Sequence, residues 1–358
     1  MNPLPKASAI LREGIGQGLH PGAQIAVFRD GRLVADLAFG LADPATGRPV
    51  TPDTPMPWLS AGKPVTALGI AALFAEGLLA PGTPVAAVLP AFAAGGKDGV
   101  TIGHLLLHTG GFRTADRLDP RMAPEETVAA ICATPLEPDW VPGITAGYHR
   151  FCSWEILGEV VRRVTGTDPA TFLRQRILDP VGIGNTWLRP RSDAEAAFRA
   201  VHHDTRNGTA VADPLLNSRE ILERGRPGAG FHGPARDLAR LYAALLEPPA
   251  GWLREETVRD ALRRHRQGLH DRTFQAVVDM GHGFLLNTPS MPYGYGSLAG
   301  PDAFGHSGAQ TGCGFADPAH GLAVAWLCNG MPGEPAHQRR QRAVNTAIHE
   351  DLGLGPDA

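Results

Sequence analysis

The sequence predicts an α+β fold in which both ends of the chain contribute strands to one sheet and a helical region is inserted between them. Strand patterns occur within residues 24–39 and return within residues 284–327. The late strands follow one another through short turns, which favours antiparallel pairing. We therefore expect an α/β domain made of residues 1–75 and 247–358, and a mainly helical domain made of residues 76–246.

The N-terminal part begins with an amphipathic pattern near residues 5–18, which predicts a helix. Apolar runs at residues 24–28 and 33–39 are typical of strands. Between them, Asp30-Gly31 is a pair that favours the tight turn of a β-hairpin. The sequence therefore predicts a hairpin at the start of the sheet.

The remaining elements follow from periodicity and from turn residues. Further helices are predicted in six segments: 101–108, 125–133, 153–165, 169–177, 234–246 and 335–351. Late strands are predicted in four: 284–287, 304–306, 314–316 and 322–327.

Composition narrows the function classes. The chain has 358 residues, of which 43% are hydrophobic and 19% charged, as in ordinary globular proteins. A net charge of -3 argues against nucleic acids or anionic membranes as partners. No apolar run has the length of a membrane-spanning helix, and residues 1–6 lack the apolar core of a signal peptide, so we expect a cytoplasmic protein. The oligomeric state is left open.

Metal and redox chemistry are not expected, and no cofactor is implied. The four cysteines are widely spaced without a Cys-x-x-Cys pair, which is typical of structural thiols: Cys132, Cys152, Cys313 and Cys328. His104 and His108 lie four residues apart, but no acidic ligand motif accompanies them. Turn or packing roles are the favoured interpretation of these two histidines.

Lysine is scarce, which draws attention to position 63. Of 33 Lys and Arg residues, only Lys6, Lys63 and Lys97 are lysine, and Lys63 follows Ser60 by three positions. A neutral lysine amine one helical turn from a serine can accept the hydroxyl proton and create a nucleophile. A chance spacing in an arginine-rich chain is the alternative interpretation.

The flanking sequence favours the chemical interpretation. Apolar residues recur with helical period over 65–74, which predicts a helix with Ser60 at its N-cap and Lys63 in its first turn. Pro64 is tolerated there because first-turn amides lack partners within the helix. The partial positive charge of the helix N-terminus stabilises an oxyanion and favours a neutral Lys63.

Two further segments carry candidate groups. Tyr148 precedes a predicted helix, and a neighbouring Lys63 cation would lower its pKa, so that the phenol exchanges protons with Ser60 and a leaving group. A packed core tyrosine is the alternative. In Gly305-His306-Ser307-Gly308-Ala309, we expect a strand lining the substrate cleft, with Gly308 allowing close approach of the substrate and the amides of Ala309 and Ser60 forming an oxyanion hole.

The order of these elements resembles the serine β-lactamase and penicillin-binding-protein superfamily, in particular its branch of family VIII carboxylesterases and AmpC-like β-lactamases. The resemblance spans nearly the whole chain and rests on these segments: Ser60-x-x-Lys63, His104-Leu105-Leu106-Leu107-His108-Thr109-Gly110-Gly111, Tyr148, Ala235–Arg240, Gly305–Gly308 and Gly314–Pro318. It implies an active site between the two domains.

The resemblance also implies a role for each residue. Ser60 would be the acylated nucleophile, Lys63 its base and Tyr148 the proton relay. The amides of Ser60 and Ala309 would bind the oxyanion. His306, Ser307 and Gly308 would contact the substrate, with His306 standing where lactamases usually carry a lysine.

Two departures from the family pattern favour esters over β-lactams. Arg150 replaces the Asn of the family's Tyr-x-Asn; it either points away or binds a substrate carboxylate. His306 replaces a permanent cation by a group that titrates near pH 6.5. We therefore expect a carboxylesterase acting on a small-molecule ester or amide. The alternatives are an acyltransferase, a β-lactamase or D-amino-acid peptidase or amidase, and a binding or sensor protein without activity.

Overall fold

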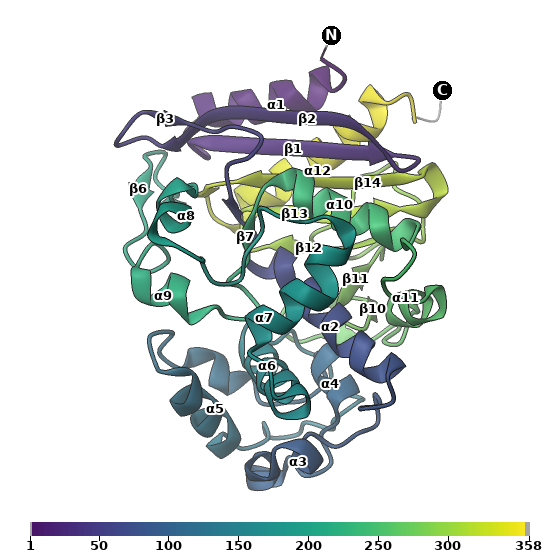
Figure 1. The fold of residues 1–358 in the computed structure, drawn as a ribbon. Coiled ribbons are helices and arrows are strands. Elements are labelled where there is room, and N and C mark those ends of the chain that lie inside the picture. Colours follow the sequence, from purple (N-terminus) through teal and green to yellow (C-terminus); the bar gives the residue numbers. More distant parts are fainter. Residues whose placement is uncertain (1, 355–358) are drawn as a thin grey trace.

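An eight-stranded antiparallel sheet is the framework of the protein (Figure 1). The structure is a computed structural model that describes residues 2–354. The sheet order is β10-β11-β12-β13-β14-β1-β2-β3. The bounds are β1 (Gly22–Arg29), β2 (Arg32–Asp43), β3 (Arg48–Pro49), β10 (Met280–Gly281), β11 (Phe284–Leu286), β12 (Phe304–Gly308), β13 (Gly312–Asp317) and β14 (Leu322–Cys328).

The two ends of the chain meet in the middle of the sheet, as predicted. Strand β1 pairs with β14 in an antiparallel register that sets Ala26 opposite Ala325. Strands β1 and β2 form the predicted hairpin, and both turn residues are left-handed, with φ of 48° at Asp30 and 71° at Gly31. This conformation matches the right-handed twist of the flanking strands.

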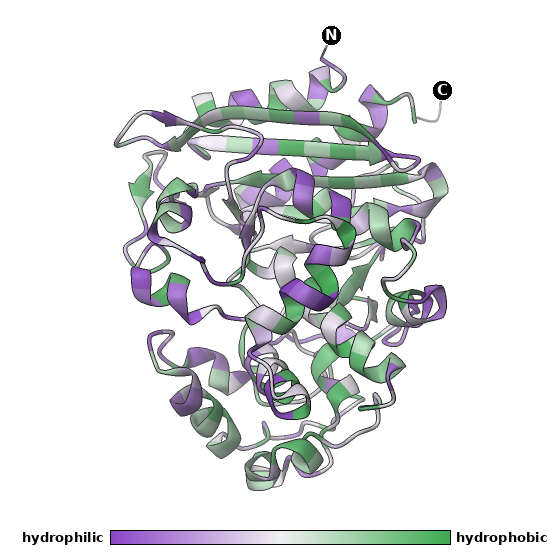
Figure 2. Ribbon diagram, viewed as in Figure 1, coloured by the Kyte–Doolittle hydropathy of each residue, from purple (hydrophilic) through white to green (hydrophobic). Residues whose placement is uncertain are grey.

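Helices cover both faces of the sheet. On one face, α1 (Pro5–Gly16) and α12 (Glu334–Asp351) pack over a core that includes Ile25. On the other face, α10 (Ala235–Leu246) packs over a core that includes the next residue along β1, Ala26. Figure 2 shows β14 as largely hydrophobic and the surface helix α11 (Glu255–Leu262) as largely hydrophilic.

A second group of helices packs beside the sheet around its own core. The central helix is α2 (Lys63–Ala75), which is buried on all sides from Lys63 to Leu73. Its neighbours include α6 (Cys152–Thr165) and α7 (Pro169–Leu173). The others are α3 (Val85–Val88), α4 (Ile102–Leu106) and α5 (Pro124–Ala133).

The α+β prediction is confirmed, and the long elements lie where the sequence predicts them. The segment 169–177 differs, because α7 ends at Leu173 and the chain continues as a π-helical turn, Arg174–Leu178. The division of the chain at residue 246 stays a prediction. Helix α10, which falls before that boundary, contacts β1, β13 and β14 of the sheet.

Most of the unpredicted elements, among them α3, are only two to six residues long, too short for a clear periodic pattern, and the amphipathic α11 was missed. Besides α3, they include α8 (Asp193–Phe198), α9 (Arg219–Arg224), α11, β4 (Met56–Pro57), β5 (His203–Asp204), β6 (Val211–Ala212), β7 (His232–Gly233), β8 (His270–Asp271), β9 (Ala276–Val277) and β15 (Gly330–Met331). Among the described residues, the four cysteines are free and buried. No helix in the described part of the chain has the length and apolarity to cross a bilayer.

Candidate active site

Ser60 lies in a 3-10 turn, η1 (Leu59–Gly62), that runs directly into α2. The prediction of Ser60 as the N-cap of the helix is wrong by two residues, since Gly62 takes that position. The residue before the serine, Leu59, is left-handed with φ of 46°, a conformation that is costly for a residue with a branched side chain. The surrounding structure therefore holds the serine on a strained turn at the start of α2.

Lys63 is completely buried behind Ser60, and its amine has three partners. The Nζ atom lies 2.9 Å from Ser60 Oγ and 2.8 Å from each of the carbonyl oxygens of Arg150 and Gly228. A neutral amine has two N–H groups and one lone pair. Because the two carbonyls accept both N–H groups, the lone pair faces the Ser60 hydroxyl.

Burial lowers the pKa of Lys63 to about 7, in the direction expected for a lysine that loses its proton readily. The negative charge of Asp116 opposes this effect, and the positive charge of Arg226 adds to it. The main cause is therefore removal from water. Near neutral pH, a large fraction of Lys63 is the free amine.

Tyr148 is buried against its neighbours, with its ring centroid 4.4 Å from that of His108. Its main-chain N–H donates to Asp271 Oδ1 at 3.0 Å. The prediction of a lowered pKa is wrong: burial raises the pKa of Tyr148 well above its ordinary value, although a hydrogen bond with Ser60 opposes the shift. The phenol therefore keeps its proton at neutral pH and is suited to donate it.

His306 lies on β12, 1% exposed. Its Nδ1 donates to the carbonyl oxygen of Ser307 at 2.9 Å. The prediction that it titrates near pH 6.5 is wrong, because burial, helped by the charge of Lys63, lowers the pKa of His306 to about 3. The imidazole is neutral at working pH and supplies no cation to a substrate.

The structure gives a packing reason for a glycine at position 308, in addition to the predicted one. A Cβ atom at this position would lie 2.4 Å from the carbonyl oxygen of Trp58 and 2.4 Å from Thr311 Oγ1. The close approach of β12 to the chain before Ser60 thus requires a glycine here, and the predicted close approach of the substrate stays a prediction. This packing brings Ala309 to the same cavity as Ser60.

The candidate residues meet in one cavity of about 480 Å³. Ser60, Tyr148, Arg150 and the segment from His306 to Ala309 all line it, whereas Lys63 lies behind its wall. Apolar side chains make up much of the remaining lining, among them Leu118, Pro120, Phe151, Leu215, Leu216, Ile221 and Leu222. The side chain of Arg150 is exposed and has no ion pair among the described residues.

Two carboxylates that the sequence did not reveal hold the loop that carries Tyr148. Asp116 accepts the N–H groups of three consecutive residues, Arg150 to Cys152. Asp271 is fully buried, binds the Tyr148 amide and pairs with Arg266 at 3.0 Å. Neither belongs to a local motif, so no sequence signal was present to find them.

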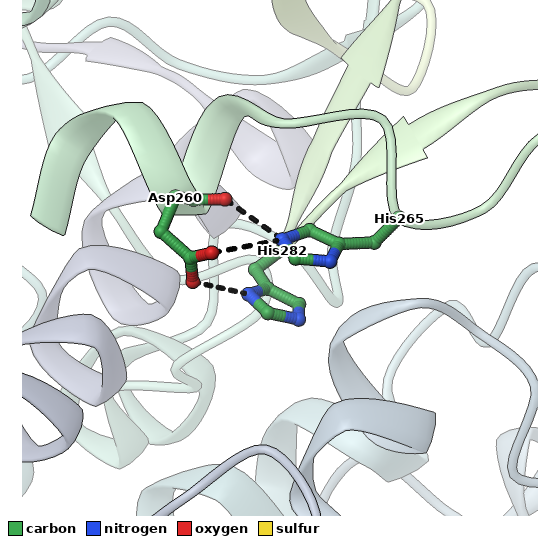
Figure 3. Close-up of side chains that lie close together, drawn as sticks. All are labelled: Asp260, His265 and His282. Carbon is green, nitrogen blue, oxygen red and sulfur yellow. Dashed lines mark hydrogen bonds and ion pairs between the residues drawn. The ribbon is translucent and has the colours of Figure 1, made fainter. Parts of the chain in front are cut away.

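Histidines also gather with aspartates outside the cavity. Figure 3 shows His265 and His282 beside Asp260. The two imidazole rings stack, with ring centroids 3.8 Å apart and planes within 15° of parallel. A metal binds imidazole in the ring plane, so stacked rings do not direct both nitrogens to one ion. Asp260 Oδ1 is also paired with Arg263 at 3.0 Å. This cluster, as arranged, is held by stacking and ion pairing.

A second cluster joins Asp317, His320 and His349. Both imidazoles contact Asp317 Oδ2, at 2.8 and 3.1 Å, and the Gly300 N–H donates to the same oxygen at 3.0 Å. The ligand atoms are thus engaged in hydrogen bonds. His104 belongs to the capping box of α4, because its Nδ1 accepts the N–H of the N-cap residue Thr101. His108 packs on Tyr148. These contacts are turn and packing roles, as the sequence favoured.

Comparisons with known proteins identify the family of the chain. The family model described as Beta-lactamase matches residues 7–348. Esterase EstB from Burkholderia gladioli is 30% identical, over 92% of this chain and 92% of its own length. A penicillin-binding-protein homologue from Caulobacter crescentus superimposes with a TM-score of 0.81 at 29% identity, covering 97% of this chain and 98% of its own.

A family VIII carboxylesterase structure has a TM-score of 0.81 at 26% identity and covers 98% of both chains. Together with the family match over nearly the full length, these similarities confirm the resemblance that the motifs indicated. The chain belongs to the Beta-lactamase family.

Proposed function

We propose that this protein is a serine hydrolase that forms an acyl-enzyme on Ser60, and that it acts as a carboxylesterase on small or medium acyl esters. One observation carries the proposal: the buried Lys63 amine, with both N–H groups directed to carbonyl oxygens, faces Ser60 Oγ at 2.9 Å. A base in this position activates a serine hydroxyl.

The residues suggest the course of the reaction. Lys63 accepts the Ser60 proton while Oγ forms a bond to the ester carbonyl carbon, and the amides of Ser60 and Ala309 bind the oxyanion. Tyr148 then donates its proton to the departing alkoxide and regains one from protonated Lys63. Water attacks the acyl-enzyme by the reverse proton path and releases the acid.

The nature of the cavity supports a largely apolar acyl group. Its lining is rich in leucine, and His306 is neutral. Arg150 stands where an amide-binding Asn occurs in the family, which argues against β-lactams and peptides. Similar proteins include one named esterase EstB and one titled a family VIII carboxylesterase.

Labelling with a fluorophosphonate followed by intact mass spectrometry tests the nucleophile. We expect one adduct per chain in the wild type and in Ser290→Ala, an exposed serine outside the cavity lining. Ser60→Ala should take up no label and should hydrolyse p-nitrophenyl esters at the background rate. A Ser60→Ala variant with full activity would refute the proposal.

Two assays separate the esterase from its alternatives. A p-nitrophenyl series from acetate to octanoate reports the preferred acyl length, and product analysis with an added alcohol or amine reports transfer. Exclusive transfer would identify an acyltransferase. Rapid turnover of nitrocefin would identify a β-lactamase; we expect a rate near background.

A further inference from the structure

Asp116 joins a distant turn to the start of α6. It lies in the 3-10 turn η3 (Arg113–Arg117), and its Oδ2 accepts the N–H of Arg150 at 2.6 Å. Its Oδ1 accepts the N–H groups of Phe151 and Cys152, each at 2.8 Å. The N-cap residue of α6 supplies no side-chain hydrogen bond, so Asp116 caps this helix from another part of the chain.

The peptide that Asp116 holds is the one that holds the base. The N–H of Phe151, which donates to Asp116 Oδ1, and the carbonyl oxygen of Arg150, which accepts from Lys63 Nζ at 2.8 Å, belong to the same peptide group. The second carbonyl that accepts from Lys63 is that of Gly228. The chain is held there by Thr66 Oγ1, which donates to the carbonyl oxygen of the preceding residue, Pro227, at 2.8 Å. A single peptide group, that between Arg150 and Phe151, thus links the Asp116 carboxylate to the lysine amine.

The negative charge of Asp116 also raises the pKa of Lys63. Around the amine, Asp116 and Glu155 are negative and Arg226 is positive, with Asp116 exerting the largest charge effect. The other titratable neighbours are kept uncharged by burial: Tyr148, Cys152, His108 and His306. Asp116 is therefore the principal anion that stabilises the protonated form of Lys63.

We propose that Asp116 is a positioning residue of the active site, which holds the Arg150 carbonyl against Lys63 and opposes release of the lysine proton. This inference rests on the proposed function of Ser60 and Lys63. It assigns two separable effects to one carboxylate. Its hydrogen bonds keep the lone pair directed at Ser60, and its charge raises the pH below which the base is lost.

Asp116→Asn and Asp116→Glu separate these effects. Asparagine removes the charge and one of the two acceptor oxygens, whereas glutamate keeps the charge but displaces the carboxylate by one methylene group. Asp119→Asn is the matched control, because Asp119 is an exposed residue three positions further along the same segment and pairs with Arg121. The readouts are kcat and KM for a neutral p-nitrophenyl ester and the rate of Ser60 labelling by a fluorophosphonate, each measured against pH.

For Asp116→Asn we expect the acid limb of kcat/KM and of labelling to move to lower pH by about 0.5 to 1 unit, since a lost anion lowers the pKa of Lys63. The plateau of kcat should fall about tenfold with KM within about twofold, because the base is misplaced while asparagine keeps the shape of the cavity wall that Asp116 helps to line. Asp116→Glu should keep the acid limb and lose plateau rate. Asp119→Asn should match the wild type in both.

An unshifted acid limb in Asp116→Asn, or wild-type plateau rates in Asp116→Asn or Asp116→Glu, would overturn the inference. If Asp116→Asn does not fold, as judged by its thermal transition, Asp116→Glu alone decides through its plateau. Failure of the proposed function is a different result, because wild-type Ser60 would then take up no label at any pH.

Discussion

The two halves of the active site are held by different forces. Ser60 and Lys63 lie on η1 and α2, where main-chain hydrogen bonds and burial set their spacing. Tyr148 and Arg150 lie on a loop outside regular structure, and the carboxylates of Asp116 and Asp271 hold that loop by its N–H groups. One half is local in sequence, and the other depends on residues more than thirty and more than a hundred positions away.

This difference separates chemistry from positioning. The helical half supplies the nucleophile and the base, with Lys63 Nζ 2.9 Å from Ser60 Oγ. Residues three positions apart in a helical turn are neighbours in any sequence, so this spacing needs no distant contacts. The loop half orients the base, because the Arg150 carbonyl oxygen accepts one of the two hydrogens of the neutral Lys63 amine. Changes in the first half should therefore abolish catalysis, while changes in the second should weaken it or the fold.

Lys63→Arg should have the largest effect on the rate. The substitution keeps a cation at the site but removes a group that can lose its proton, so we expect kcat/KM to fall at least ~10²-fold. Steady-state kinetics on a p-nitrophenyl ester would measure it. Lys6→Arg, a change of the same type at an exposed residue that pairs with Glu350, is the control. Unimpaired turnover by Lys63→Arg would remove Lys63 from the mechanism.

Tyr148→Phe tests the loop half directly. It removes the phenol proton that we assign to the leaving group and leaves the ring packed on His108. We expect kcat to fall about 10- to 100-fold for alkyl esters, and much less for p-nitrophenyl esters, whose leaving group needs no proton. Comparing the two substrate types measures this. Equal losses on both would argue for a role of Tyr148 in activating Ser60 instead.

Asp271→Asn should act mainly on stability. Asp271 and Arg266 are 0% and 2% exposed, so the change leaves a buried guanidinium without its charge partner. We expect the free energy of unfolding to decrease by about 3 kcal/mol, with only a few-fold loss of kcat in the folded protein. Urea denaturation would measure it. Glu255→Gln, which breaks an exposed pair with Arg259, should leave the transition unchanged. A wild-type transition in Asp271→Asn would show that the loop does not depend on this pair.

The same contrast explains what the sequence could predict. Ser60 and Lys63 were found because their spacing is local, and the long strands and helices because their periods are local. Asp116 and Asp271 were not found because they act across the fold. The pKa expectations for Tyr148 and His306 were wrong because burial, which exceeds the effect of neighbouring charges here, is a property of the folded chain.

The central claim is that neutral Lys63 is the base that activates Ser60. The most direct measurement is the rate of Ser60 acylation by an activated ester as a function of pH, in single turnovers of the wild type. Since burial lowers the pKa of Lys63 to about 7, the rate should be full above that pH and should fall as Lys63 gains its proton below it. A rate that stays constant down to pH ~5, or one that still rises through pH ~9, would contradict the account.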